Sequence, residues 1–473
     1  MSKISQSDNY TANFGYCFRS SSIFYVPPQP ISTSIVVSNY WSFKNNIKVF
    51  LLVNWRDMRG NLVRRESVNF DNKNVSTISP PSEFSGSCEV EAFSGQDLMI
   101  PYSAIMGVYE TKESVSMVHS YSRTYSQIEV EDGRTISDGH EGCWVLRDCA
   151  DIRSFAVIHN GPEANSSQEI SLVVTNHSGV SKKIQWTEAE MNPFETRKIY
   201  PGQHFPNLVK FLDGKEGACS IDYELNKSFT RLLLGWESID QRQLQVTHSN
   251  FDYSKHETDF VESDQTTAFM SIPFVQDSEI RVLIYPDRSP GEYLISSNGN
   301  KYYELPCTLE NRSSKSGERL KFRKKEGKLP TRIVTAIQLK SPTYHNIIPC
   351  ECSLGVVHAL RPGKRFHWGV WSARFNSKLL ITSYPEIYGE IGDPQVVFRF
   401  YGDHGTNISE QKISWKEISE DGENASLEIN QICPDNQFNK DAYGYISIWS
   451  EYNGFFAFTT LSKNHSISIE HTF

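Results

Sequence analysis

The sequence lacks the apolar segments that would place it in a membrane. No stretch approaches the roughly 20 apolar residues that a membrane-spanning helix needs. Residues 1–18 are largely polar and do not resemble a signal peptide. The nine cysteines are scattered and odd in number, which is typical of reduced thiols. We therefore expect a cytoplasmic protein that does not associate with a membrane.

A general excess of basic residues is also absent. Lysine and arginine total 47 against 56 aspartates and glutamates, and the formal net charge is -9. A protein that binds nucleic acid through its phosphates is normally basic overall. We therefore expect no nucleic-acid partner.

One basic segment departs from this acidic balance. It covers residues 315–325 and includes Arg323 and Lys324. Such a segment could attract an anionic glycan or another anionic polymer. The alternative is a solvated hairpin in which Leu320 and Phe322 face inward and the charges face water.

Portable catalytic and cofactor motifs are missing as well. The sequence contains no Gly-x-Ser-x-Gly, no His-Glu-x-x-His, no phosphate-binding glycine loop and no dinucleotide fingerprint. Cys350-Glu351-Cys352 and the pair Cys143 and Cys149 do not match zinc spacing, so buried thiols are expected. We predict no metal and no cofactor. The missing motifs favour a protein that is not an enzyme. An enzyme stays possible, because the catalytic carboxylates of glycosidases have no fixed spacing in sequence.

Helical periodicity is nearly absent, and strand patterns take its place. Apolar residues come in short runs bounded by Asn, Asp, Gly, Ser and Pro. Ile170, Leu172 and Val174 alternate as they would on one face of a strand. Asn298-Gly299 is typical of a hairpin turn. These patterns predict an all-β fold with short loops and few helices.

The strand pattern recurs four times along the chain. A short apolar run, a polar gap and a second apolar run lead each time to a turn glycine. These glycines lie about 110 to 120 residues apart, a period that suits one small β-sandwich. The first runs are 35–39, 155–160, 269–272 and 379–382, and the glycines are Gly60, Gly179, Gly291 and Gly405.

A chain of this length is expected to form several domains rather than one core. We predict a tandem array of about four diverged β-sandwich units, of which the third is degenerate. Their predicted bounds are 1–130, 131–256, 257–366 and 367–473.

The sharpest local signal is a repeated His-Ser dipeptide near the end of a unit. It begins at His119 and at His248, and Asp252 would share a strand face with His248. A His and an Asp on one face could hold a metal ion or pair as a catalytic base and the group that orients it. The alternative, which we favour, is that each imidazole satisfies a backbone group in every copy. Two further segments resemble this last strand, Glu470–Phe473 and, in the third unit, Val356–Ala359.

Three tryptophans are candidates for contacts with a sugar ring. Trp368 and Trp371 lie at the third boundary, and Trp236 precedes the end of the second unit. An aromatic face could stack on a sugar. Packing between two sandwiches is the alternative.

The leading hypothesis is a non-enzymatic recognition or scaffold protein that binds carbohydrate or another surface polymer. Linked modules suit multivalent binding. Two alternatives stay open: an enzyme that acts on a glycan or glycan precursor at a domain seam, and a structural component of a viral or cell-surface assembly. No catalytic or metal-binding residue is assigned, and the pattern sets no oligomeric state. The candidate ligand-binding residues are His119, His248, Asp252, Trp236, Trp368, Trp371, Arg323 and Lys324.

Overall fold

The described part of the chain is mostly antiparallel strands with little helix, which confirms the predicted all-β fold. In the part of the chain described here, the longest helix has 6 residues, and none is long and apolar enough to span a membrane. The computed structural model describes residues 18–68, 70, 73–96, 98, 100, 104–131, 141–223, 228–249, 267–273, 275, 279–284, 292–296, 302–304, 307–313, 318–329, 333–340, 348–355, 357–358, 362–403, 408–433, 439 and 441–472.

The first sandwich consists of two sheets with the orders β1-β6-β3-β4 and β5-β2-β7-β8. The short strand β9 extends the first of these sheets beside β1. Its elements are β1 (Phe18–Val26), β2 (Ser32–Ser38), α2 (Tyr40–Asn45), β3 (Phe50–Asp57), β4 (Leu62–Val68), β5 (Val75–Ile78), β6 (Gly86–Ser94), β7 (Ile105–Glu110), β8 (Val115–His119), β9 (Ser122–Thr124) and α3 (Gln127–Glu131).

The second sandwich has the sheet orders β10-β15-β12-β13 and β14-β11-β17-β18. Its strand β16 pairs with β9 and so joins a sheet of the first sandwich. Its elements are β10 (Glu141–Leu146), β11 (Ile152–His159), β12 (Gln168–Thr175), β13 (Ser181–Glu188), β14 (Thr196–Ile199), α4 (Pro201–His204), α5 (Leu208–Leu212), β15 (Gly217–Asp222), β16 (Ser228–Thr230), β17 (Leu233–Ser238) and β18 (Leu244–His248).

The third sandwich has the sheet orders β22-β21-β24-β19-β27 and β23-β20-β25-β26. Strands β21 and β22 pair as the predicted hairpin requires, although Asn298 and Gly299 lie outside the described residues. Its strands are β19 (Thr267–Ile272), β20 (Glu279–Ile284), β21 (Glu292–Ser296), β22 (Tyr302–Glu304), β23 (Cys307–Ser313), β24 (Glu318–Lys324), β25 (Val334–Lys340), β26 (Cys350–Gly355) and β27 (Val357–His358).

The fourth sandwich has the sheet orders β28-β33-β30-β31 and β32-β29-β34-β35. Its elements are β28 (Phe366–Ser372), β29 (Asn376–Ser383), α6 (Pro385–Tyr388), β30 (Gln395–Tyr401), β31 (Ile408–Ser414), α7 (Trp415–Ile418), β32 (Asn424–Glu428), α8 (Ile429–Ile432), β33 (Tyr443–Ser450), β34 (Phe455–Lys463) and β35 (Ser466–His471).

One strand order is common to all four sandwiches. When the eight core strands of a unit are numbered along the chain, one sheet has the order 1-6-3-4 and the other 5-2-7-8. Alternating apolar residues fill the space between the sheets, as Ile170, Leu172 and Val174 do in the second unit. Of the predicted boundaries, 130/131 falls at the end of α3, 256/257 lies outside the described residues, and 366/367 falls at the start of β28.

In the third unit, the apolar runs chosen from the sequence are displaced by one strand relative to those of the other units. Its first apolar run, 269–272, lies in β19, the first strand, whereas the runs chosen in the other units lie in the second strand. The expected last strand, Val356–Ala359, is also misplaced: β27 pairs with β19, and the eighth strand is β26. First and second strands are both buried and apolar, so a run alone does not reveal which of them it forms.

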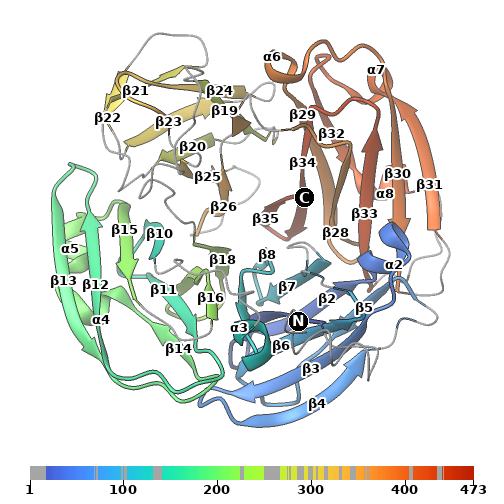
Figure 1. The fold of residues 1–473 in the computed structure, drawn as a ribbon. Helices are drawn as coiled ribbons and strands as arrows, with labels where there is room; N and C mark the ends of the chain where they lie inside the picture. The colour runs from blue at the N-terminus through green and yellow to red at the C-terminus, as the bar shows by residue number, and fades with distance from the viewer. Residues whose placement is uncertain are drawn as a thin grey trace, which may run out of the picture.

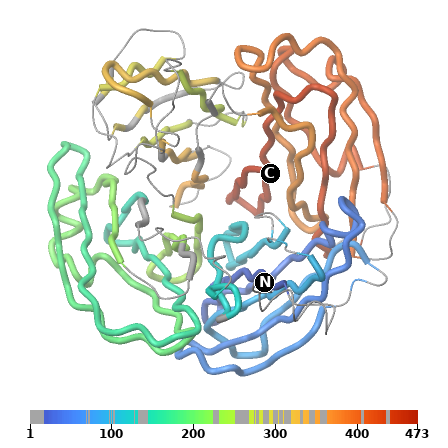
Figure 2. Tube along the Cα trace, in the orientation of Figure 1, coloured from blue at the N-terminus to red at the C-terminus, as the bar shows by residue number. Residues whose placement is uncertain are grey.

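The four sandwiches surround a common centre, and the last strand of each lies innermost (Figure 1). We call β8, β18, β26 and β35 the closing strands. Each forms the edge of its sheet. Strand β8 contacts β18 and β35, and β26 contacts the same two strands, so the closing strands form a closed ring. The trace in Figure 2 shows the fourth strand of each unit at the rim.

Serine hydroxyls join the closing strands where no ladder of backbone bonds exists. The Leu244 and Val246 N–H groups each donate to a serine of the first unit, Ser114 Oγ and Ser116 Oγ, at 2.9 Å. On the other side of β8, Met117 N–H donates to Ser468 Oγ at 2.9 Å. The backbone N–H and C=O groups on the outer side of an edge strand would otherwise lack hydrogen-bond partners. The serine hydroxyls accept hydrogen bonds from these N–H groups, and the neighbouring strand covers the edge.

Charged and aromatic side chains join neighbouring sandwiches farther from the centre. Arg147 Nη2 of the second unit lies 2.6 Å from Glu351 Oε2 of the third. Arg319 Nη2 of the third unit lies 2.6 Å from Glu423 Oε2 of the fourth, and Lys463 Nζ of the fourth lies 2.6 Å from Glu110 Oε1 of the first. These pairs link the second sandwich to the third, the third to the fourth and the fourth to the first.

Replacing Ser116 by alanine tests the contribution of the hydroxyl contacts. The Val246 N–H would lose its buried acceptor, and we expect the free energy of unfolding to fall by about 1–3 kcal/mol. Thermal and urea unfolding followed by circular dichroism measure the change. Ser167→Ala, which removes an exposed hydroxyl that donates to Glu188 O, is the matched control. Equal stability of the two variants would contradict a role for Ser116 in holding the ring.

Candidate functional site

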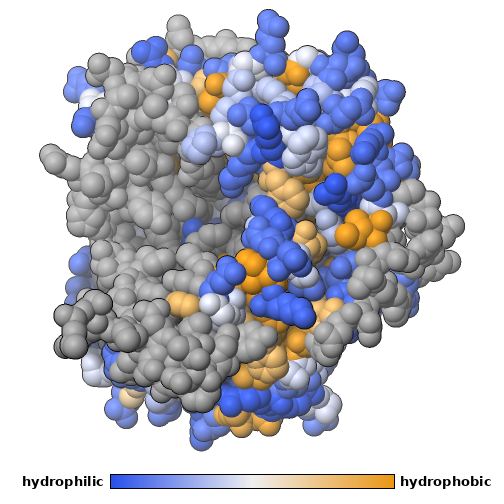
Figure 3. Space-filling view, turned by 45° about the vertical axis from the view of Figure 1, so that its right-hand side comes forward, coloured by the Kyte–Doolittle hydropathy of each residue, from blue (hydrophilic) through white to orange (hydrophobic). Residues whose placement is uncertain are grey.

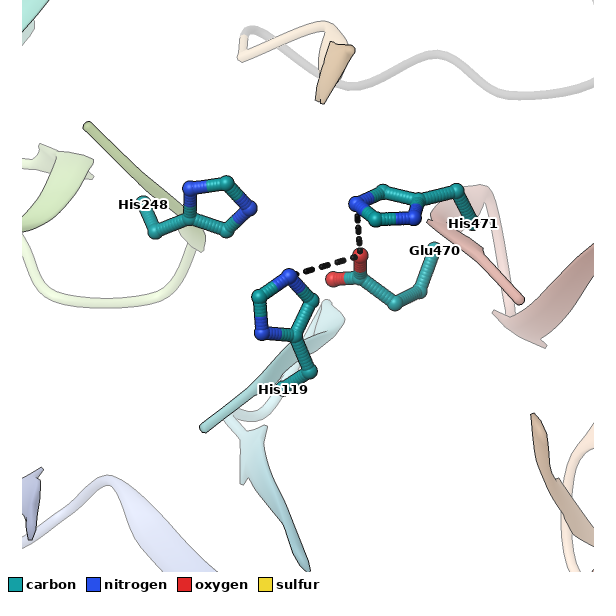
Figure 4. A group of neighbouring side chains, drawn as sticks. All are labelled: His119, His248, Glu470 and His471. Carbon is teal, nitrogen blue, oxygen red and sulfur yellow. Dashed lines mark ion pairs between the residues drawn. The ribbon is translucent and has the colours of Figure 1, made fainter. Parts of the chain in front are cut away.

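The closing strands bring their last residues together at the centre of the molecule. Strands β8, β18 and β35 end in His119, His248 and His471, and β26 ends in Gly355. Figure 4 shows the three imidazoles turned toward one another, with the Glu470 carboxylate between two of them. We call His119, His248, Glu470 and His471 the axial cluster. It unites residues from three sandwiches.

The axial cluster is compact. The ring centroids of His119 and His248 are 4.4 Å apart, and those of His119 and His471 are 5.2 Å apart. Glu470 Oε1 lies 3.9 Å from His119 Nε2 and 3.6 Å from His471 Nε2. One nitrogen or oxygen from each of the four residues lies within 4.8 Å of all the others.

Backbone carbonyls orient two of the three imidazoles. His119 Nδ1 lies 2.6 Å from Ser120 O, and His248 Nδ1 lies 2.9 Å from Ser249 O. A carbonyl only accepts, so each Nδ1 carries the proton and donates, and each Nε2 keeps its lone pair. This contact is the backbone role that the repeated His-Ser dipeptide suggested.

The axial cluster is buried, and burial disfavours charge. His119, His248 and Glu470 are almost completely buried, while the His471 side chain is 23% exposed. Burial lowers the pKa of His119 well below its ordinary value, and His248 and His471 add to this effect. Burial also raises the pKa of Glu470 to about 8, although hydrogen bonds from the backbone and the Arg231 charge oppose the rise. The donor set can therefore share a proton or hold a divalent transition-metal ion.

A second candidate site is a recess of about 1010 Å³ in the first sandwich, beside α2. Four phenylalanines contribute apolar faces, and two lysines contribute positive charge. Apolar residues gather among polar ones on the side of the molecule that carries the first and fourth sandwiches (Figure 3). The lining residues are Asn39, Ser42, Phe43, Lys48, Val49, Phe50, Leu52, Ser67, Val68, Phe70, Lys73, Asn74 and Phe93.

Among the predicted ligand-binding residues, the structure brings His119 and His248 into one cluster. Asp252, expected beside His248, lies outside the described residues. Arg323 and Lys324 lie on β24 in the third sandwich and line neither site. The inward positions of that strand, Leu320 and Phe322, are fully buried, as the hairpin alternative predicted.

The three candidate tryptophans are covered by protein. Trp236 is fully buried and donates from Nε1 to Val145 O at 2.9 Å. Trp368 is 2% exposed and stacks on Tyr40 of the first sandwich, with centroids 4.2 Å apart. Trp371 is equally buried and meets Phe400 edge to face. Packing explains all three positions, and contact with a sugar stays a prediction.

Sequence reasoning did not select Glu470 and His471, nor did it locate the recess. A signal for His471 was present, because residues 470–473 resemble the last strands that carry His119 and His248. The recess gives no such signal, since its lining comes from α2 and several strands that are distant in sequence.

No protein-family model matches the chain, and no curated protein is detectably similar to it. The axial cluster and the recess therefore rest on their own geometry.

His159 provides a buried histidine away from the axial cluster. Its Nδ1 lies 2.9 Å from Thr196 Oγ1, and its Nε2 lies 2.9 Å from the hydroxyl of Tyr121. Burial lowers the pKa of His159 to about 3, so the folded protein keeps this imidazole neutral at every pH near neutrality.

We predict that His159 makes a contribution to the free energy of unfolding that is lost as the pH is lowered from 7 to 5. The unfolded chain protonates His159 near its ordinary pKa of about 6.5, but the folded chain does not, so each such histidine contributes up to about 1.4 kcal/mol per pH unit below that pKa. In urea unfolding at pH 7, 6 and 5, the free energy of unfolding of His159→Gln should therefore rise relative to that of the unaltered protein as the pH is lowered. His177→Gln, at an exposed position, should keep the slope of the unaltered protein. Equal slopes for the unaltered protein and His159→Gln would contradict the prediction.

Proposed function

We propose that the protein is a non-enzymatic recognition protein that binds an anionic carbohydrate in the recess of its first sandwich. The observation that carries this proposal is the lining of the recess. It combines aromatic faces, amide and hydroxyl groups and two lysines in a volume of about 1010 Å³. This volume is within the range of ordinary small-ligand sites.

Each part of the lining matches a part of a sugar ligand. Flat aromatic faces, such as that of the half-exposed Phe50, suit the apolar face of a pyranose ring. The side chains of Asn39 and Ser42 offer donors and acceptors for ring hydroxyls. Lys48 and Lys73 supply the positive charge that a carboxylate or sulfate group requires.

The same lining argues against glycan hydrolysis in the recess. Among the residues that the structure describes, no Asp, Glu, His or Cys lines the recess. Hydrolysis of a glycosidic bond normally needs a pair of carboxylates, and other acid-base or nucleophilic mechanisms need a similar partner. The recess therefore favours binding over the alternative of an enzyme acting on a glycan.

The ring of closing strands supports a scaffold role for the rest of the molecule. Because β8, β18, β26 and β35 contact one another, the sandwiches are held as one body that presents its loops in fixed directions. The rival hypothesis of an assembly component predicts concentration-dependent oligomers in light scattering. The negative net charge argues against nucleic acid as a partner.

An array of neutral, carboxylated and sulfated oligosaccharides tests the proposal, followed by calorimetry on the strongest ligand. We expect preference for anionic sugars, and we expect the double variant Lys48→Ala/Lys73→Ala to lose about tenfold or more in affinity, since a hydrogen bond to a charged group contributes about 1.5–3 kcal/mol. Phe50→Ala should weaken the binding of anionic and neutral sugars alike.

Lys416→Ala, an exposed lysine of the fourth sandwich, is the matched control and should bind as the unaltered protein does. Absence of binding to every sugar on the array would refute the carbohydrate assignment. An equal loss of affinity in the control would show that general charge, and not the recess, governs binding.

A further inference from the structure

We propose that the axial cluster of His119, His248, Glu470 and His471 binds one divalent transition-metal ion of the Zn²⁺ class, and that this ion ties the last strands of three sandwiches together. The sequence predicted no metal, because metal-binding motifs are recognised from ligands that lie close together in the chain. The four donors come from three segments that are distant in the chain and meet only in the folded protein.

The spacing of the donors fits a tetrahedral ion. With Zn–N and Zn–O distances near 2.0–2.1 Å, neighbouring ligand atoms of a tetrahedral site lie about 3.3 Å apart. Glu470 Oε1 is 3.9 Å from His119 Nε2 and 3.6 Å from His471 Nε2. Both distances are too long for hydrogen bonds and only slightly longer than such a tetrahedral edge. With all four donor atoms within 4.8 Å of one another, small side-chain movements would complete the site.

The orientation of the imidazoles has the form that metal ligands require. A metal-binding histidine normally donates its second ring N–H to a carbonyl or carboxylate, which fixes the tautomer and ring direction. His119 and His248 donate in this way to Ser120 O and Ser249 O. Each neutral ring then carries a lone pair on Nε2, and Nε2 of His119 lies 3.9 Å from Glu470 Oε1. A cation between these two electron-rich groups would make their approach favourable.

The chemistry of the donors selects the class of ion. Imidazole nitrogen suits Zn²⁺ and its transition-metal neighbours, whereas Mg²⁺ and Ca²⁺ prefer oxygen ligands. Three imidazoles and one carboxylate make four donors, the number found in closed structural zinc sites. Gly355, the last residue of β26, supplies no side chain, so Glu470 provides the fourth donor. The nearby Arg231 charge opposes the ion, and the carboxylate offsets it.

Metal content of the full-length protein is the first test. Protein purified without chelator from zinc-supplemented medium should contain about one zinc per chain by inductively coupled plasma mass spectrometry. After removal of the metal, one equivalent of Co²⁺ should produce the intense visible bands of tetrahedral coordination, and Zn²⁺ should abolish them. Metal-depleted protein should melt at a lower temperature than the same protein reloaded with Zn²⁺.

Substitution of the ligands is the second test. His471→Gln is the preferred variant, because this partly exposed side chain can be replaced with little disturbance of the core. It should lose the cobalt bands and the zinc-dependent rise in melting temperature, while keeping the circular dichroism spectrum of a folded β protein. His119→Gln should behave in the same way, and His177→Gln, at an exposed site, should retain both properties.

Two results would overturn the proposal. One is unaltered protein that holds no zinc and shows no cobalt bands, which would make the axial cluster a proton-sharing network alone. The other is a folded His471→Gln variant that binds Co²⁺ with the same spectrum and affinity as the unaltered protein. Metal binding should be unaffected in Lys48→Ala/Lys73→Ala, so the axial cluster and the recess can fail separately.

Discussion

The arrangement of the whole molecule depends on how four sheet edges are covered. The eighth core strand of each sandwich lies at the edge of a sheet, where one row of backbone donors and acceptors has no partner within the unit. An isolated sandwich would expose that edge to other chains. Here β8, β18, β26 and β35 meet at the centre, and serine hydroxyls such as Ser116 Oγ satisfy the facing N–H groups. Closure of the ring therefore removes an aggregation hazard as well as joining the units.

This closure explains why equivalent residues of different sandwiches become neighbours. When copies of one fold surround a centre, the last residue of every closing strand arrives at the same place. A histidine at that position in three units becomes a cluster of three imidazoles, although its nearest copies are more than a hundred residues apart in sequence. Gly355 and Glu470 break the equivalence. A repeated residue that looks structural in each unit acquires a collective chemistry only after the units assemble.

The sequence was sufficient for the fold class but not for the geometry of the axial cluster. Alternation in segments such as 168–174 reports a strand with one buried face, so the all-β architecture could be predicted from local patterns. Which strand each apolar run of the third unit forms could not be predicted, because β19 and β20 are equally apolar. His119 and His248 were selected from their repeated dipeptide. That His471 lies beside them became evident only from the ring of closing strands. Local spacing contains no information on which strand ends converge, since that depends on packing between units.

The geometry also separates the two candidate sites by their tasks. The axial cluster is buried, and a metal there would have four protein donors and no open position, which is the character of a structural site and not of a catalytic one. The described lining of the recess has an exposed aromatic face at Phe50 and two lysines, and it includes no carboxylate or imidazole. The axial cluster thus has reactive groups that are largely covered, whereas the described lining of the recess is accessible and includes no acid-base group. The proposal of a non-enzymatic binding protein depends on both features.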